Sequence, residues 1–138
     1  MIRVTRRYHF PAAHVLRHPS FSDAENERVY GKCANPAGHG HNYGVEVTVA
    51  GPVDEGSGRV VDPDALDAIV SRRVIARFSH RLLNEDAAFA RLVPTAENLA
   101  RVVHDELLAP ISRLGAARLA RVRVLETRKN SFAYGDPE

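Results

Sequence analysis

Alternation of apolar and polar residues near both ends of the chain is the feature that most constrains its fold. Apolar and polar residues alternate over residues 2–10, valines alternate with other residues over 42–50, and a similar pattern fills 118–126. Successive side chains of a β-strand point to opposite faces, so each segment predicts a strand with one apolar face. A shorter strand near residues 130–134 would complete the sheet.

Two segments between the second and third predicted strands have apolar residues at helical spacing instead. Asp62 is suited to an N-cap and Pro63 to the first helical position, and a helical stripe follows to about residue 78. A second helix begins near Pro94, and we expect it to end before Pro110. This order predicts an α+β domain with a four-stranded antiparallel sheet and both helices on one face.

Length and composition are typical of a globular protein with one domain, which we take to span residues 1–138. The chain is 44% hydrophobic and 26% charged. Its net charge of +2 is too small and too dispersed to predict nucleic-acid binding. No apolar run approaches the roughly 20 residues of a membrane span, and no apolar signal core follows the first residues. With a single thiol, we expect a cytoplasmic protein that binds neither nucleic acid nor membrane.

The long connection at residues 15–38 and the residues around it carry most of the chemistry. A connection of this length in a compact domain is often functional. His39 and His41 lie two residues apart, so an extended strand would place both imidazoles on one side, and His14 could complete the set from another strand. Three neutral imidazoles suit Zn²⁺ and leave a fourth position open for water or substrate. A pair of ordinary surface histidines is the plainer alternative.

Cys33 is the only cysteine, so it has no disulfide partner within the chain. It lies in a polar stretch with glycine and proline, where the neighbouring Lys32 would favour the thiolate. The residues alone leave three roles open for it. These are a reactive thiol, a small buried apolar side chain, and the fourth ligand of a closed structural zinc site with the three histidines.

These motifs together resemble the 6-pyruvoyl-tetrahydropterin synthase family. The most specific segment is ERVYGKCANPAGHGHNY, at residues 27–43. Shorter matches cover nearly the whole chain in the family's order: FPAAH at 10–14, VDPDAL at 61–66, SHRLLNED at 79–86, PTAEN at 94–98 and ETRKN at 126–130. The resemblance implies a tunnelling fold, in which three subunits join their sheets into a barrel and two such trimers stack.

The resemblance also implies the residues of the site. The positions of the family's zinc ligands are held here by His14, His39 and His41, and those of its catalytic residues by Cys33 and His80. Its pterin contacts correspond to Glu126 and Thr127 and, from a neighbouring subunit, to Thr95 and Glu97. Plainer interpretations exist for His80 as a helix-end histidine, Thr95 as a helix cap and Glu126 as a solvated carboxylate.

One position departs from the family pattern. The family has an aspartate before its catalytic histidine, where this chain has Ser79. Serine cannot carry the negative charge that completes the family's proton relay. Either Asp86 or Glu85 replaces that charge, or the relay is weakened, or the chemistry differs.

The implied activity is that of a zinc-dependent lyase. It would convert 7,8-dihydroneopterin triphosphate to 6-pyruvoyl-tetrahydropterin with loss of triphosphate, at sites between the subunits of a homohexamer and without a redox cofactor. An alternative is the family's queuosine-pathway branch, 6-carboxy-tetrahydropterin synthase, although the five residues between Cys33 and His39 match the pyruvoyl-forming branch better. A zinc- and pterin-binding protein with weak turnover is a third alternative, supported by Ser79.

Overall fold

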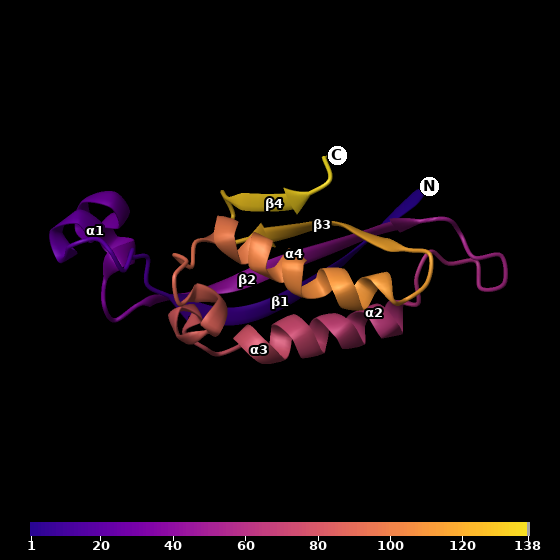
Figure 1. Cartoon of the computed structure of the whole chain (residues 1–138), viewed down its shortest axis with the longest axis horizontal. Coiled ribbons are helices and arrows are strands. Elements are labelled where there is room, and N and C mark those ends of the chain that lie inside the picture. Colours follow the sequence, from indigo (N-terminus) through magenta and orange to yellow (C-terminus); the bar gives the residue numbers. More distant parts are fainter. Residues whose placement is uncertain (138) are drawn as a thin grey trace.

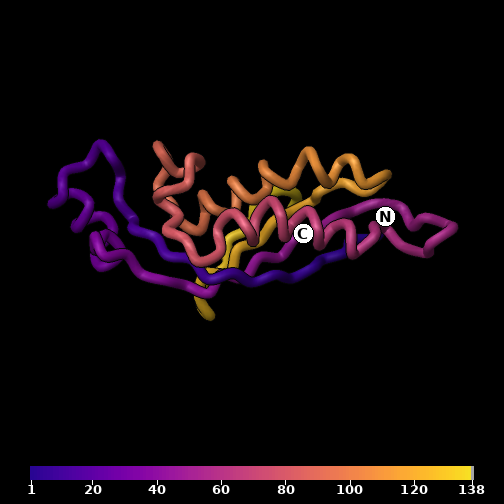
Figure 2. Tube along the Cα trace, turned by 90° about the horizontal axis from the view of Figure 1, so that it is seen from below, coloured from indigo at the N-terminus to yellow at the C-terminus, as the bar shows by residue number. Residues whose placement is uncertain are grey.

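The computed structural model describes residues 1–137, and a four-stranded antiparallel sheet organises them in the order β1-β2-β3-β4. The strands are β1 (Ile2–His14), β2 (His39–Gly51), β3 (Arg118–Leu125) and β4 (Ser131–Gly135). The helices α2 (Pro63–Val70), α3 (Ala76–Phe78) and α4 (Ala96–Ser112) cover one face of this sheet (Figure 1, Figure 2). The predicted α+β architecture is therefore confirmed. The last residue of the predicted domain, Glu138, lies outside the described residues.

The alternating pattern of the strands produces the inner face of the sheet. Tyr8 pairs with Val45 and Phe10 with Tyr43, so the predicted apolar faces of β1 and β2 coincide. On β3, Val124 pairs with Val45 and extends the same face. Helix residues complete a core whose fully buried members include Leu66, Val70, Val74, Leu99, Val103 and Leu107.

The helices begin as predicted, but one of them ends later. Asp62 accepts a hydrogen bond from the Asp64 N–H at 3.0 Å and so caps α2, whose turns continue through residues 71–75 into α3. The prediction that the second helix ends before Pro110 was wrong, because α4 continues to Ser112. Pro110 lies in the last turn, where its missing N–H costs a single helical hydrogen bond, and its ring is buried in the core. No helix within residues 1–137 has both the length and the apolar character needed to cross a bilayer.

The connection between β1 and β2, which we call the β1–β2 lobe (residues 15–38), is partly helical. It contains α1 (Asp23–Tyr30), which is followed by a tight helical turn over Gly31–Ala34. Figure 1 shows α1 beyond the end of the sheet, at the left of the molecule. Apolar periodicity could not reveal this helix, because its only buried residue is Asn26. Its capping box, in which the Ser22 hydroxyl accepts from the Glu25 N–H, was the available signal.

Candidate metal centre and active site

The inner face of the β1–β2 pair changes from apolar side chains to imidazoles toward one end. Phe10 and Tyr43 are fully buried and stack with their ring centroids 5.5 Å apart. The next two pairs on this face are Ala12 with His41 and His14 with His39. The regular strand pairing thus brings the three histidines together, although the chain between His14 and His39 contains the whole β1–β2 lobe.

The geometry of this histidine cluster fits a metal ion. The potential ligand nitrogens of His14, His39 and His41 all lie within 4.8 Å of one another, and His14 Nε2 is 2.9 Å from His39 Nε2. Tetrahedral zinc with Zn–N bonds of about 2.0–2.1 Å would hold its ligand nitrogens about 3.3 Å apart, so small side-chain movements suffice. His41 Nε2 is buried and has no hydrogen-bond partner among the described residues. A buried nitrogen without a partner destabilises the fold, and coordination of a metal ion by its lone pair would remove that cost.

Hydrogen bonds to His14 select the tautomer that can bind a metal. The Pro94 carbonyl lies 2.8 Å from Nδ1 and can only accept, so Nδ1 carries the proton. The Tyr43 hydroxyl oxygen lies 3.0 Å from the same nitrogen and provides a second acceptor. Nε2 therefore keeps its lone pair on the side of His39. Burial lowers the pKa of His14 to about 4, so the imidazole is neutral and ready to act as a ligand at neutral pH.

Glu126 lies at the edge of the same cluster. It follows Leu125, the end of β3, which pairs with Gly44 of β2. Burial lowers the pKa of His39, and the negative charge of Glu126 opposes this shift. Burial also raises the pKa of Tyr43, and the same charge adds to that effect. The structure therefore brings a carboxylate into the electrostatic environment of the histidines.

The other residues predicted to contact a pterin have local roles in the chain. The Thr127 hydroxyl accepts from the N–H groups of Lys129 and Asn130, each at 3.2 Å, and so stabilises the turn after β3. The Thr95 hydroxyl accepts from the Asn98 N–H at 3.2 Å and caps α4. Glu97 is exposed in the first turn of the same helix.

Cys33 lies beside the cluster but outside it. It is half-buried in the turn after α1, and its carbonyl accepts from the Leu16 N–H at 2.7 Å. Leu16 is two residues beyond His14, so this hydrogen bond holds Cys33 next to the end of β1. The sulfur is not one of the clustered ligand atoms, which leaves a three-histidine site with an open position.

His80 lies apart from the cluster, along the free edge of β1. Its N–H donates to the Pro11 carbonyl at 2.6 Å, and the Arg81 carbonyl accepts from the Ala13 N–H at 2.9 Å. Among the described residues, His80 is the only non-glycine residue with positive φ, at 61°. Such a conformation costs about 1–2 kcal/mol and is concentrated at functional sites. The exposed side chain lines an open depression with Pro11, Ala13, Gly40 and Asn42.

The structure restricts which acid can assist His80. Asp86 accepts two hydrogen bonds from the Arg77 guanidinium, at 2.9 and 2.6 Å, and another from the Ala88 N–H. The hydrogen bonds from Arg77 hold the pKa of Asp86 below its usual range. Asp86 is therefore committed to Arg77, whereas Glu85 is exposed. Both acids line, with His80, a second depression that adjoins the first. The His80 imidazole itself has no hydrogen bond within the described residues.

Sequence reasoning missed Asn84, although the residue lies within a recognised motif. Its side-chain oxygen accepts from the Val15 N–H and its amide donates to the Val15 carbonyl, both at 2.8 Å. These two hydrogen bonds fasten the segment that follows His80 to the residue directly after His14. The sequence did show an amide side chain close to the predicted catalytic histidine. Its spacing in the sequence, however, could not reveal that this amide contacts the end of β1.

Comparisons with known proteins agree with this geometry. The model of the family described as 6-pyruvoyl tetrahydropterin synthase matches residues 3–137. The 6-pyruvoyl tetrahydrobiopterin synthase of Drosophila melanogaster is 40% identical over 97% of this chain and 79% of that protein. The solved structure of Caenorhabditis elegans 6-pyruvoyl tetrahydropterin synthase has a TM-score of 0.91 at 38% identity, covering 99% of this chain and 96% of its own. A putative 6-carboxy-5,6,7,8-tetrahydropterin synthase of Archaeoglobus fulgidus is 38% identical over 78% of this chain and 82% of that protein.

Proposed function

This chain belongs to the 6-pyruvoyl tetrahydropterin synthase family, and we propose that it is a zinc-dependent lyase acting on 7,8-dihydroneopterin triphosphate. The products would be 6-pyruvoyl-tetrahydropterin and triphosphate. The observation that supports this most directly is the histidine cluster. Its three ligand nitrogens lie within 4.8 Å of one another, beside the charge of Glu126 and the turn that carries Cys33.

The proposed metal ligands are His14, His39 and His41. Zinc held there would supply Lewis-acid polarisation of the substrate's side-chain oxygens. The protein prepares the site by keeping His14 neutral, because its burial disfavours the imidazolium, and by holding its Nδ1 proton on the Pro94 carbonyl. The buried and unpartnered His41 Nε2 supports the same assignment.

Proton transfer is assigned to Cys33 and His80. As a thiolate, Cys33 would remove a proton from a side-chain carbon of the substrate, and His80 would handle the opposite transfer. Loss of triphosphate and an internal rearrangement complete the reaction, so no external oxidant or reductant is required. His80 is presented on the edge of β1 rather than in the histidine cluster, which supports an active site assembled between subunits.

Glu126 is assigned to the pterin ring. Its two carboxylate oxygens match the parallel donors formed by the pterin 2-amino group and the adjacent ring N–H. The hydroxyls of Thr127 and Thr95 are used within the chain, so we assign their contribution to backbone groups. Glu97 is exposed and is assigned to a site of the neighbouring subunit.

The proposed assembly is a homohexamer, a pair of stacked trimers. In the single chain β1 and β4 are the two edge strands of the sheet, and residues 80–82 cover β1 only near residues 11–13. Exposed strand edges favour pairing with another chain, and joining β1 of one copy to β4 of the next would close a barrel. Mass measurement of the native assembly tests this arrangement.

Product analysis tests the reaction itself. The zinc-loaded protein is incubated with 7,8-dihydroneopterin triphosphate, and the pterins are separated and identified by mass. We expect 6-pyruvoyl-tetrahydropterin together with triphosphate. Formation of 6-carboxy-tetrahydropterin would instead assign the chain to the carbon–carbon-cleaving branch, which the archaeal relative represents. Pterin binding without turnover would identify a binding protein.

A further inference from the structure

Around α1, the β1–β2 lobe is held together mainly by polar contacts, together with a contact between the rings of His18 and Phe21, whose centroids are 4.7 Å apart. The only buried residue of α1 is Asn26, whose side chain is fully inaccessible to solvent, whereas Val29 on the same helix is 53% exposed. The helix packs mainly against the turn at residues 31–34 that follows it, and that turn contains Cys33. The conformation of the lobe therefore depends on a few hydrogen bonds.

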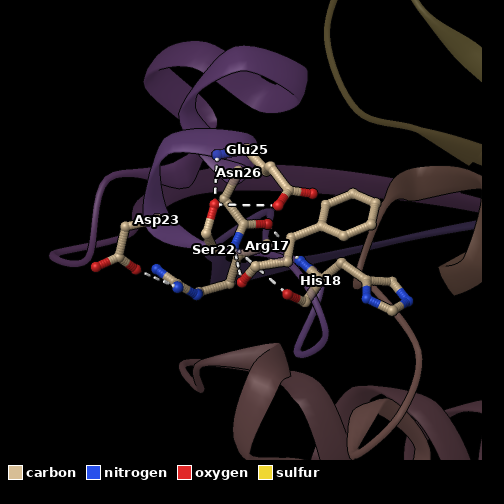
Figure 3. Close-up of polar contacts among 7 residues, drawn as sticks. Arg17, His18, Ser22, Asp23, Glu25 and Asn26 are labelled. Atoms are coloured by element: carbon tan, nitrogen blue, oxygen red, sulfur yellow. Dashed lines mark hydrogen bonds and ion pairs between the residues drawn. The ribbon is translucent and has the colours of Figure 1, made fainter.

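Asn26 makes the hydrogen bonds that join the two halves of the lobe. Its side-chain oxygen accepts from the His18 N–H at 2.7 Å, and its amide group donates to the carbonyls of His18 and Phe21 at 3.4 and 3.3 Å. Figure 3 shows Asn26 directed from α1 toward the segment that carries His18. The exposed pair of Arg17 with Asp23 lies at the periphery of the same group.

These contacts form a closed ring that includes Cys33. From Asn26 the chain runs along α1 to Gly31, whose N–H donates to the Glu27 carbonyl, and then to Cys33. The Cys33 carbonyl accepts from Leu16, and the chain returns from Leu16 to His18 and so to Asn26. Asn26 provides the buried side-chain contact that closes this ring.

We propose that Asn26 is a positioning residue for Cys33, which determines where the thiol lies relative to the histidine cluster. The consequence for catalysis rests on the function proposed above, whereas the effect on the position of Cys33 does not. Without the Asn26 side chain, a part-buried N–H and two carbonyls lose their partner. We expect the lobe to open roughly 10- to 100-fold more often, because the loss of several hydrogen bonds together shifts an equilibrium by that much.

Three variants of the full-length, zinc-loaded protein test this proposal. Asn26→Ala removes all three hydrogen bonds. Asn26→Asp keeps the size and the acceptor for His18, but replaces the donor with an oxygen that faces two carbonyls. Asp23→Asn is the control, because the Asp23 side chain is on the same helix, is 92% exposed and makes only the peripheral ion pair with Arg17.

Amide hydrogen exchange at Leu16 reports directly on the hydrogen bond to Cys33. In both Asn26 variants we expect protection at Leu16 and His18 to fall by at least about tenfold, with β2 amides and zinc content unchanged. The turnover number should fall while KM stays within about twofold, because the pterin and metal contacts lie outside the lobe. Asp23→Asn should match the unmodified protein in every measurement.

The outcomes separate the inference from the proposed function. Unchanged protection at Leu16 in Asn26→Ala would overturn the positioning role, whatever happens to turnover. Lost protection with full turnover would support the structural role of Asn26 but refute Cys33 as the proton-abstracting group. A loss of zinc or of β2 protection in both Asn26 variants would show that the effect spreads through the fold, and would also overturn the inference.

Discussion

Acidification of the zinc-free protein is expected to destabilise it in a pH range set by His14. Burial lowers the pKa of this histidine from 6.5 to about 4. The unfolded chain therefore binds a proton below about pH 6.5 that the folded protein does not accept until about pH 4. A depressed histidine pKa means that stability is fully present above pH 6.5 and is lost as the pH falls toward 4.

The magnitude follows from the size of the shift. Each pKa unit corresponds to about 1.4 kcal/mol. Protonation of His14 alone should therefore lower the free energy of unfolding by roughly 3 kcal/mol over the full range, and by about 2.5 kcal/mol at pH 4.5. The pKa of His39 is also lowered by burial, which adds to the effect in the same direction. The carboxylates whose pKa values are depressed, Asp67 and Asp86 among them, titrate at lower pH and contribute little in this range.

Urea unfolding of the zinc-free protein at pH 7.5 and pH 4.5, at one fixed protein concentration, measures this loss. His14→Asn is the matched variant, because its amide can still donate to the Pro94 carbonyl but does not titrate. We expect this variant to be less stable at pH 7.5 but to lose about 2.5 kcal/mol less on acidification. If the two proteins lose the same free energy of unfolding between these pH values, His14 is not the buried neutral group described here.

Further predictions concern the metal, the proton-transfer groups and the strained backbone. His39→Ala should lose both bound zinc, measured by elemental analysis, and turnover. Cys33→Ala should retain pterin binding and lose turnover, whereas Glu126→Ala should weaken pterin binding by calorimetry, since two charge-assisted hydrogen bonds disappear. His80→Gly should be more stable to urea than His80→Ala by about 1 kcal/mol, because only glycine accepts a φ of 61° without strain; equal stabilities would contradict the strain. Ser79→Asp should raise turnover by up to about 10²-fold with little change in KM if a missing charge limits His80, and an unchanged rate would point to Glu85 or another route.

Local patterns in the sequence determined much of this protein. The period-two alternation predicted three of the four strands and their inner faces, and the spacing of His39 and His41 predicted that both lie on the same side of β2. The caps at Asp62 and Thr95 predicted where two helices begin. These features depend on residues within a few positions of one another, so the local sequence is enough to predict them.

Tertiary structure decided the features that depend on contacts between distant residues. The register of β1 against β2 sets His14 opposite His39, and packing lets α4 continue through the buried Pro110. The polar α1 has no apolar stripe because a single buried amide anchors it.

The same physical reason applies to His80, which we propose for proton transfer, and to its candidate acid Asp86. Asp86 is bound by Arg77, and His80 lies on the edge of β1 away from the histidine cluster. Each of these arrangements joins groups whose separation in sequence says nothing about their distance in space. The sequence carries the chemical groups and their local geometry, but strand register and side-chain packing determine which of them meet.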